Sequence, residues 1–552
     1  MRFLRPISIA ISLAILSSLA LPLSSGGALA QSEDWEFLTL GIDYKEFHLS
    51  DPNNVFVSRM ERDNPNVTIE GLLADGVIWD ENPVDSRETV RSMFIQAEGT
   101  LGFWGKQWGM RMDAVVGING FFTVSESDPT LRSGQVQSGW YAKRFMELQS
   151  MSGFVWNQNR SAFFGQCIYH IADKQRVTFL DQASVYQKFH DINVPRGDNQ
   201  MILYTTQYGA STRTDNEGLE VVVEMQRPTS PLPAGAGAQG IIRQIRPNSG
   251  NSPIPFDHIV LSAVGDSVES LEGKAKVGER VAISQEINYC IIPVPPEERY
   301  DWTNAYTAIG VDKYILKKGN INVGQDIAQR QPMTAIAFNE DYVYFIVVDG
   351  RESGVSRGMS NYEIAQFAKT YLSATEAATL DGGGSSTMVV NDEVVNNTTC
   401  NFINCDDDTR AIPIDDTTGL LMEATDLGDA NGSPTMGVWS IETEIYEAIV
   451  PNGLLMVVAE PPVLFNAFPV GSTPQVFTDT GLRLGPGDNY DRIDTIPEWS
   501  SVTVVENINN MNGISVQGAY WWKVSYNEQV GWAALDVTQV DFPNHVYLPI
   551  IR

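Results

Sequence analysis

The residues best suited to chemistry stand in one stretch, Leu380 to Val390, which reads LDGGGSSTMVV. One carboxylate, Asp381, is followed by three glycines and three hydroxyl side chains. Three consecutive glycines cost conformational entropy and pack little, so they indicate close approach of the backbone to another group. Exposed amides in such a loop suit an anion or a polar ligand. The alternative is a tight turn between two strands, with Asp381 capping its own loop.

A second acid ends a predicted strand. The apolar run 343–348 predicts a buried strand, and Asp349-Gly350-Arg351 follows it. A helix is predicted over 361–370, because Ser360 and Glu363 form a capping-box pattern and its apolar residues recur at helical spacing. The next strand leads into Asp381. If the two strands are parallel, they form a right-handed crossover unit. Both strands then end at one edge, which places Asp349 and Arg351 near Asp381.

Several motifs in order along the chain resemble the phosphodiester glycosidase family. Besides 380–390 and the following NDEVVN, they are AVVGINGFF at 114–122, Asn193-Val194-Pro195-Arg196 ahead of a strand at 201–205, and RQPMTAIA at 330–337. Two departures weaken the match to the last motif, because Met333 replaces the family's arginine and Ala337 its glycine.

The resemblance covers most of residues 35 to 460 and implies hydrolysis of a sugar-1-phosphodiester at the glycosidic C–O bond. Asp381 is the candidate carboxylate at the anomeric centre, as nucleophile or as base for water, and Asp349 is the second candidate. Arg196, Arg330 and Arg351 are candidate phosphate partners, since a guanidinium binds phosphate oxygens in a fork. The full set of predicted substrate-binding residues is Asn119, Arg196, Arg330, Thr334, Gly350, Arg351, Gly382, Gly383, Gly384, Ser385, Ser386 and Thr387.

Two other functions stay open at this point. One is a phosphodiesterase that cleaves the P–O bond, and the other is a non-catalytic protein that binds cell-wall glycan. The expected substrate is a phosphodiester-linked glycan of a cell surface or the extracellular space.

The expected fold is α+β, with a mixed β-sheet catalytic domain, covering helices and a small C-terminal barrel. LRLGPGDNY at 482–490, WWKV at 521–524 and GWA at 531–533 resemble the bacterial SH3-like domain. Such modules are often attached to exported enzymes and can bind cell-wall polymer, whereas Trp522 and Trp532 are expected in the small barrel's core. The predicted segments are a signal peptide (1–30), a catalytic domain (31–460), a linker (461–473), an SH3-like domain (474–542) and a tail (543–552).

The first thirty residues have the features of a secretory signal. Arg2 and Arg5 precede an apolar run, and Ala28-Leu29-Ala30 provides a cleavage site. The sequence therefore predicts a secreted protein with no stable membrane insertion after cleavage. Removal of the signal takes away two of 37 basic residues and none of 68 acids, which gives 35 − 68 = −33. Such a charge excludes nucleic acid as a partner.

Four cysteines suit an oxidising compartment and allow three pairings. Cys400 and Cys405 enclose a short loop, which favours that bridge, and Cys167 with Cys290 follows by elimination. Metal binding is the weaker alternative, because no CxxC or His partner lies near. No cofactor is expected. The acids 406–408 and 415–416 leave calcium open, but they lack the spacing of a calcium loop.

Overall fold

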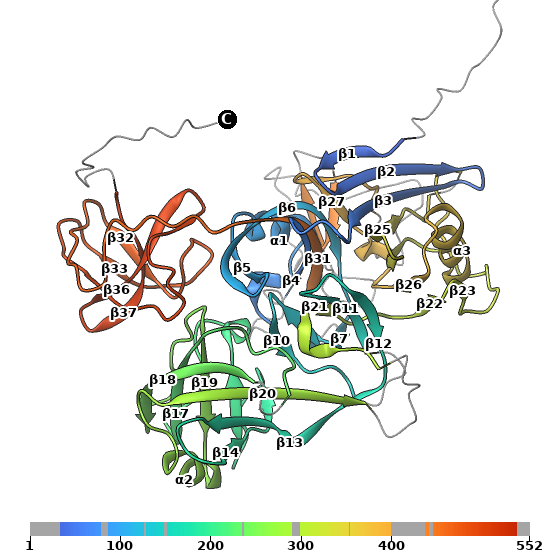
Figure 1. Ribbon diagram of the computed structural model, residues 1–552. Coiled ribbons are helices and arrows are strands. Elements are labelled where there is room, and N and C mark those ends of the chain that lie inside the picture. The colour runs from blue at the N-terminus through green and yellow to red at the C-terminus, as the bar shows by residue number, and fades with distance from the viewer. Residues whose placement is uncertain are drawn as a thin grey trace, which may run out of the picture. The chain divides into compact units, whose positions relative to one another are not determined.

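The structure is a computed structural model that describes residues 34–78, 87–125, 128–147, 152–233, 237–289, 299–352, 354–398, 437–440 and 445–537. The helices and strands that it describes belong to one compact unit, Glu36–Arg552. Strands hold 48% of the residues and helices 9%. The fold is therefore β-rich (Figure 1).

The first large sheet carries the strand that leads into Asp381. Strand β24 lies between β25 and β26 and is antiparallel to both, so β25 and β26 run in the same direction. Both end at the edge of the sheet where β24 begins. In sheet order, the strands are β1 (Glu36–Thr39), β2 (Ile42–Leu49), β3 (Asn53–Glu61), β25 (Tyr342–Val348), β24 (Met333–Phe338), β26 (Glu376–Thr379), β22 (Tyr314–Lys317) and β23 (Asn320–Ile321).

A six-stranded sheet shares a core with the first sheet. Buried residues of both sheets, including Phe56, Val116, Ile118, Phe345 and Leu454, form one apolar cluster. Removal of this surface from water stabilises the pair of sheets. In sheet order, the strands are β28 (Glu393–Val394), β27 (Met388–Val390), β6 (Gln107–Asn119), β31 (Asn452–Glu460) and β4 (Val67–Leu73), with β5 (Leu101–Trp104) beside β6.

Two further sheets come mostly from the middle of the chain. One has eight strands: β14 (Val185–Lys188), β13 (Ile168–Phe179), β20 (Arg280–Tyr289), β18 (Ala238–Pro247), β17 (Leu219–Met225), β19 (His258–Ala263), β16 (Met201–Tyr204) and β15 (Asp191–Ile192). The other has five: β10 (Trp140–Lys143), β9 (Gln135–Gln137), β21 (Ala305–Ile309), β11 (Gly153–Asn157) and β12 (Ala162–Gly165). Within the described residues, β15 and β16 are the one pair of neighbouring strands that is parallel.

The last sheet follows residue 474. Trp522 is buried in its own core, whereas Trp521 and Trp532 belong to a core shared with the eight-stranded sheet. The rings of Trp532 and Phe256 lie 5.6 Å apart. The SH3-like assignment and the domain boundaries stay predictions. The strands are β33 (Arg492–Ile496), β32 (Thr480–Arg483), β37 (Gln529–Ala534), β36 (Ala519–Tyr526) and β34 (Thr503–Val504), with β35 (Ile514–Val516) beside β36.

Two further pairs of strands form separate hairpins. They are β7 (Thr123–Ser125) with β8 (Asp128–Leu131), and β29 (Gly437–Ser440) with β30 (Ile445–Ala448).

Helices are short in the described part of the chain. They are α1 (Val90–Ala97), α2 (Asp266–Glu272) and α3 (Asn361–Tyr371), with single 3-10 turns η1 (Ala74–Gly76), η2 (Thr206–Tyr208), η4 (Trp302–Asn304) and η5 (Gly383–Ser385). The expected α+β class is therefore correct only as a β-rich fold, because antiparallel neighbours need no helical crossover. None of the described helices has the length and apolar character needed to cross a bilayer.

The elements predicted around the site are confirmed. The predicted strand 343–348 is β25, and the predicted helix 361–370 is α3, with both hydrogen bonds of the Ser360–Glu363 capping box. The AVVGINGFF motif at 114–122 begins within β6, which ends at Asn119.

Candidate active site

The backbone of Asp381 is fixed on both sides as it leaves β26. Its N–H donates to the carbonyl oxygen of Gly120 (3.0 Å), and its own carbonyl accepts from Nδ2 of Asn119 (2.8 Å). The preceding Leu380 N–H donates to the carbonyl of Thr334 (2.9 Å). Two segments far apart in sequence, at Asn119-Gly120 and at Thr334, thus hold the start of the glycine loop.

Asn119 is the centre of this arrangement. Its side chain is fully buried, and its Oδ1 accepts from the Thr334 hydroxyl (2.7 Å) and from the Thr387 N–H (3.2 Å). Asn119 and Thr334, which the sequence predicts as substrate-binding, are therefore brought to Asp381. Because their polar atoms bond within the protein, the structure gives them a positioning role.

The glycines of the loop allow close backbone contact, as their spacing predicts. Gly383 has a φ of +67°, and its N–H donates to the carbonyl of Pro332 (2.9 Å). A Cβ on Gly382 would lie 3.0 Å from that carbonyl oxygen, and a Cβ on Gly350 would lie 2.6 Å from the Pro332 nitrogen. The Asp381 loop and the Asp349-Gly350-Arg351 turn therefore meet at one proline.

The Asp381 carboxylate is mostly withdrawn from water. Burial raises its pKa to about 7, the exposed Asp312 acts in the same direction, and hydrogen bonds from the Ser385 hydroxyl and the Gly382 N–H partly oppose the rise. The hydroxyl oxygens of Ser386 and Thr387 are buried without a hydrogen-bond partner in the described structure. A carboxyl group whose pKa is raised to about 7 suits proton transfer or nucleophilic attack near neutral pH.

Asp349 reaches the same edge but faces inward. It is 1% exposed, and its carboxylate accepts from Nδ2 of Asn396 (3.1 Å) and from the Asn397 N–H (3.0 Å). Asn396 in turn donates to the carbonyl of Ser386 (3.0 Å) and accepts from the Met388 N–H (2.7 Å). Asp349 therefore positions the end of the glycine loop through Asn396.

The two arginines nearest in sequence to this edge differ in their surroundings. Arg351 follows Gly350 and is exposed. Arg330 donates from Nε to both carboxylate oxygens of Glu363 (3.0 Å each) and from Nη2 to Asp51 (3.1 Å). Glu363 also caps α3. Arg330 therefore stabilises the N-terminal end of α3 through its contact with Glu363.

Arg196 lies on the eight-stranded sheet. Its Nη1 donates to the Ser262 hydroxyl (2.8 Å) and its Nη2 to Asp215 (2.6 Å). No contact in the described structure joins Arg196 to the Asp381 loop. It lies between β15 and β16, and its partner Ser262 belongs to β19 of the same sheet.

Comparison with known proteins identifies the part of the chain that contains this site. Residues 262–413 match the phosphodiester glycosidase family. The segment includes Asp349, Arg351 and Asp381, whereas Asn119 and Arg196 lie outside it. The family resemblance seen in the sequence is thereby confirmed for this segment. No curated protein matches the chain.

Three solved structures are similar to parts of the chain. A hypothetical protein from Synechocystis is 16% identical, with a TM-score of 0.42, and the match covers 76% of this chain and 62% of that one. A Burkholderia pseudomallei K96243 protein, named as a candidate exported protein, is 16% identical with a TM-score of 0.40 and 74% coverage of both chains.

The third structure is the catalytic domain of zebrafish N-acetylglucosamine-1-phosphodiester alpha-N-acetylglucosaminidase, auto-inhibited by its pro-peptide. It is 11% identical, with a TM-score of 0.27, and the match covers 65% of this chain and 75% of that one. At TM-scores below 0.5, the three likenesses carry no functional weight.

Sequence reasoning missed several groups that support the phosphodiester glycosidase segment. Asn396 lies in the quoted NDEVVN motif, yet only the structure shows it between Asp349 and Ser386. Asn452 was not singled out, although its Oδ1 accepts from the Phe121 N–H (2.8 Å) and so fixes the chain beside Gly120. The repeated asparagines of the motif were the available signal for Asn396.

The described residues contain one group of potential metal ligands, Glu224, Asp257 and His258. It does not fit a metal, because Glu224 is bonded by Lys523 Nζ (2.6 Å) and Arg243 Nε (2.6 Å). Asp257 lies 2.6 Å from Nδ1 of His258 and accepts from Asn507 (3.1 Å). The acidic stretches 406–408 and 415–416 lie outside the described residues.

The disulfide predictions also fall largely outside the described residues, which contain Cys167 but not Cys290, Cys400 or Cys405. Cys167 is buried, and the next residue, Ile168, pairs with Tyr289 across β13 and β20. That register favours the predicted pairing of Cys167 with Cys290, which stays a prediction.

Proposed function

We propose that the chain is a secreted hydrolase that cleaves a sugar-1-phosphodiester at the glycosidic C–O bond, with Asp381 as the reacting carboxylate. One observation carries the proposal. Within the segment that matches the phosphodiester glycosidase family, a mostly buried aspartate has its backbone groups hydrogen-bonded to Asn119 and Gly120 and its pKa raised to about 7.

The reaction needs little acid catalysis from the enzyme, because a phosphate is already a good leaving group. The enzyme must stabilise positive charge at the anomeric carbon and hold the departing phosphate. Ionised Asp381 serves the first need, either as nucleophile or as base for water. The exposed Arg351, one residue beyond the glycine that packs on Pro332, is the proposed phosphate partner.

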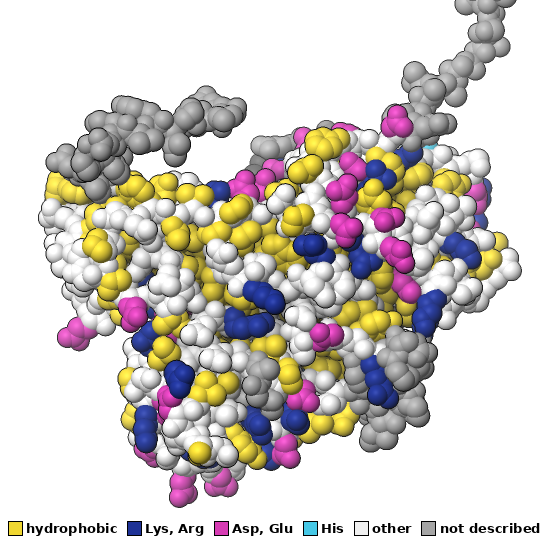
Figure 2. All heavy atoms as spheres, viewed as in Figure 1, with side chains coloured by type: hydrophobic (Ala, Val, Ile, Leu, Met, Phe, Trp, Pro, Cys, Tyr) yellow, Lys and Arg dark blue, Asp and Glu magenta, His cyan; other side chains and the backbone are white. Residues whose placement is uncertain are grey.

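Arg330 and Arg196 stay candidate phosphate partners, as the family motifs imply. Each guanidinium already donates to carboxylates of the protein, so contact with phosphate would compete with an existing ion pair. On the face shown in Figure 2, Lys and Arg side chains are scattered among Asp and Glu. Binding of an anionic substrate therefore depends on local contacts.

Export and cell-wall contact belong to the same proposal. The N-terminal signal pattern supports secretion, and the C-terminal motifs support binding of cell-wall polymer. N-terminal sequencing of the protein recovered from the culture medium tests the first point, with Gln31 as the expected first residue.

Hydrolysis of an N-acetylhexosamine-1-phosphodiester in ¹⁸O-labelled water tests the reaction. Cleavage of the glycosidic bond places the label in the released sugar, whereas label in the phosphate would identify a P–O phosphodiesterase. Asp381→Asn should lower kcat/KM about 10³-fold or more while the circular dichroism spectrum is unchanged. Asp341→Asn, at an exposed acid that makes no proposed contact with substrate, is the control and should retain activity.

If neither the natural chain nor Asp341→Asn cleaves any member of a panel of sugar-1-phosphodiesters and teichoic-type polymers, the glycan-binding alternative replaces the hydrolase.

A further inference from the structure

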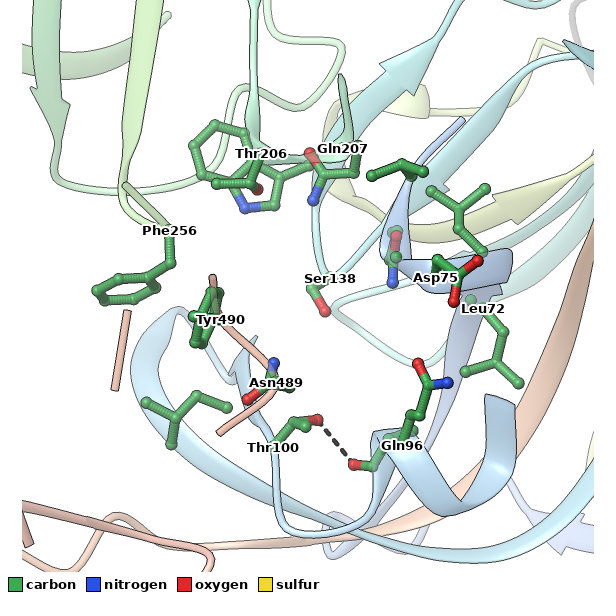
Figure 3. Close-up of a pocket in the computed structure, with 18 of the residues that line it drawn as sticks. Leu72, Asp75, Gln96, Thr100, Ser138, Thr206, Gln207, Phe256, Asn489 and Tyr490 are labelled. Atoms are coloured by element: carbon green, nitrogen blue, oxygen red, sulfur yellow. Dashed lines mark hydrogen bonds between the residues drawn. The ribbon is translucent and has the colours of Figure 1, made fainter. Parts of the chain in front are cut away.

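A cavity of about 210 Å³ lies apart from the Asp381 loop. It is lined by parts of β4, α1, β9 and η2, and by residues 484 and 489–491 of the C-terminal region. None of its lining residues falls within the matched segment 262–413. Figure 3 shows Gln96, Ser138, Gln207 and Asn489 around this hollow.

Two carboxamides at the cavity have bonding capacity that no contact among the described residues uses. Gln207 is 7% exposed, and its Oε1 accepts from the Thr205 hydroxyl (2.7 Å), which leaves its nitrogen directed into the hollow (Figure 3). The Oε1 atom of Gln137 is buried and has no hydrogen-bond partner in the described structure. A buried polar atom left unpaired costs about 1–3 kcal/mol, so a ligand that pairs with it gains affinity.

The charges of the lining exclude an anionic ligand. Glu70, Asp75 and Asp491 line the cavity, and the lining residues include no Lys or Arg. The Glu70 oxygens already accept from the N–H groups of Gly71 (3.0 Å) and Ser138 (2.9 Å) and from the Tyr306 hydroxyl. A phosphate would therefore meet carboxylates with no compensating cation in the lining.

The remaining groups suit a polyhydroxyl compound. A hydroxyl donates and accepts, so it can serve both the Gln137 oxygen and the Gln207 nitrogen. The ring of Tyr490, 5.7 Å from that of Phe256, adds an aromatic wall. An apolar wall with a few convergent polar groups is the usual composition of a small-molecule site.

We propose that this cavity binds a neutral sugar unit, through Gln137, Gln207 and Asn489, with Tyr490 as its aromatic wall. The site goes beyond the proposed hydrolysis, because it holds an uncharged part of a glycan and shares no residue with the Asp381 loop. Its size suits one hexose or N-acetylhexosamine of a longer chain.

The test measures binding by isothermal titration calorimetry on the full mature chain carrying Asp381→Asn, so that hydrolysis cannot consume the probe. The neutral probes are chitotetraose, cellotetraose and maltotetraose, and a glycerol phosphate oligomer is the anionic comparison. Gln137→Leu removes an atom that has no partner in the described structure, and Asn489→Ala changes an exposed side chain, so neither should unfold the protein. Gln529→Ala, at an exposed carboxamide outside the cavity, is the control.

At least one neutral tetrasaccharide should bind saturably. Gln137→Leu and Asn489→Ala should each raise its Kd roughly threefold to tenfold, the value of one hydrogen bond, and Gln529→Ala should leave it unchanged. The proposal is overturned if no neutral probe binds, if the cavity variants bind as the parent does, or if the glycerol phosphate oligomer binds as tightly. Because binding is measured without turnover, these outcomes do not depend on whether Asp381 is catalytic.

Discussion

Two regions of the molecule bury carboxylates in opposite ways. At the glycine loop, Asp381 accepts from a hydroxyl and an amide, and no Lys or Arg forms an ion pair with it in the described structure. At the contact between the eight-stranded sheet and the C-terminal sheet, Glu224 is paired with Lys523 and Arg243, and Asp257 with His258.

The pKa values follow this difference. Burial raises the pKa of both Asp381 and Asp257, but for Asp257 the contacts with His258, Lys523 and Asn507 outweigh burial and leave the pKa below its ordinary value. A compensated buried charge holds parts of a fold together, whereas an uncompensated one is available for chemistry near neutral pH. Burial also raises the pKa of Glu70 and Glu447 to about 7, so what distinguishes Asp381 among these acids is its place in the matched segment 262–413.

The largest expected effect on stability concerns the buried ion pairs of Glu224. Lys523→Met removes one of the two ion pairs that Glu224, a fully buried acid, makes in the described structure. The variant should lower the free energy of unfolding by about 3–5 kcal/mol. Urea denaturation measures the loss. Lys174→Met, which breaks the half-exposed pair with Glu286 (3.3 Å), is the matched control and should cost at most about 1 kcal/mol. Equal losses in the two variants would mean that the buried pair stabilises the fold no more than the half-exposed pair does.

A second prediction compares two buried asparagines. Asn119→Ala removes three hydrogen bonds around Asp381 and should cost about 2–3 kcal/mol of stability. It should also lower kcat/KM about 100-fold, because the carboxylate is displaced. Asn193 makes a similar set of bonds, to the carbonyl of Ala142 and to Thr205. Asn193→Ala should cost similar stability but change kcat/KM less than about threefold; parallel losses of activity would argue against a positioning role for Asn119.

The pH dependence sharpens the comparison. Because the ionised form of Asp381 reacts, kcat/KM should rise with pH with a midpoint near 7. Since the folded pKa is raised, the stability contributed by protonated Asp381 is present at low pH and lost as pH rises through about 7. Asp381→Asn should therefore gain stability relative to the natural chain between pH 5 and pH 8. A constant difference in unfolding free energy over that range would mean that the pKa of Asp381 is not raised.

The smallest expected effects concern the arginines. Arg351→Met should raise KM about tenfold by removing the proposed phosphate partner. Arg330→Met should change kcat/KM less than about threefold, because that guanidinium is engaged by Glu363 and Asp51. Steady-state kinetics on one sugar-1-phosphodiester measure both. If Arg330→Met has the larger effect, the predicted phosphate role passes to Arg330.

Patterns among residues close in sequence were enough to predict several elements of the fold. The apolar run 343–348, the capping box at Ser360 and the triple glycine each act through neighbours in sequence, so β25, α3 and the tight loop at Gly382–Gly384 could be inferred directly. The proximity of Asp349 to Asp381 could also be inferred from the sequence, because strands that run in the same direction end at the same edge of the sheet.

Roles that depend on distant partners could not be inferred in this way. Asp349 and Asp381 are both acids after buried strands, yet one is bonded to Asn396 and the other has its pKa raised to about 7. Arg330 and Arg196 match family motifs, but their ion pairs with Glu363 and Asp215 appear only in the folded chain. Trp532 likewise packs on Phe256 in a shared core, which its own motif does not indicate.

The sequence by itself determined which residues carry the candidate chemistry, because the glycine loop and its aspartate depend on local backbone freedom and on the strand before them. The tertiary structure alone decided which charges are compensated. Compensation depends on groups tens or hundreds of residues apart, such as Lys523 and Glu224, and their contact is set by the packing of whole sheets.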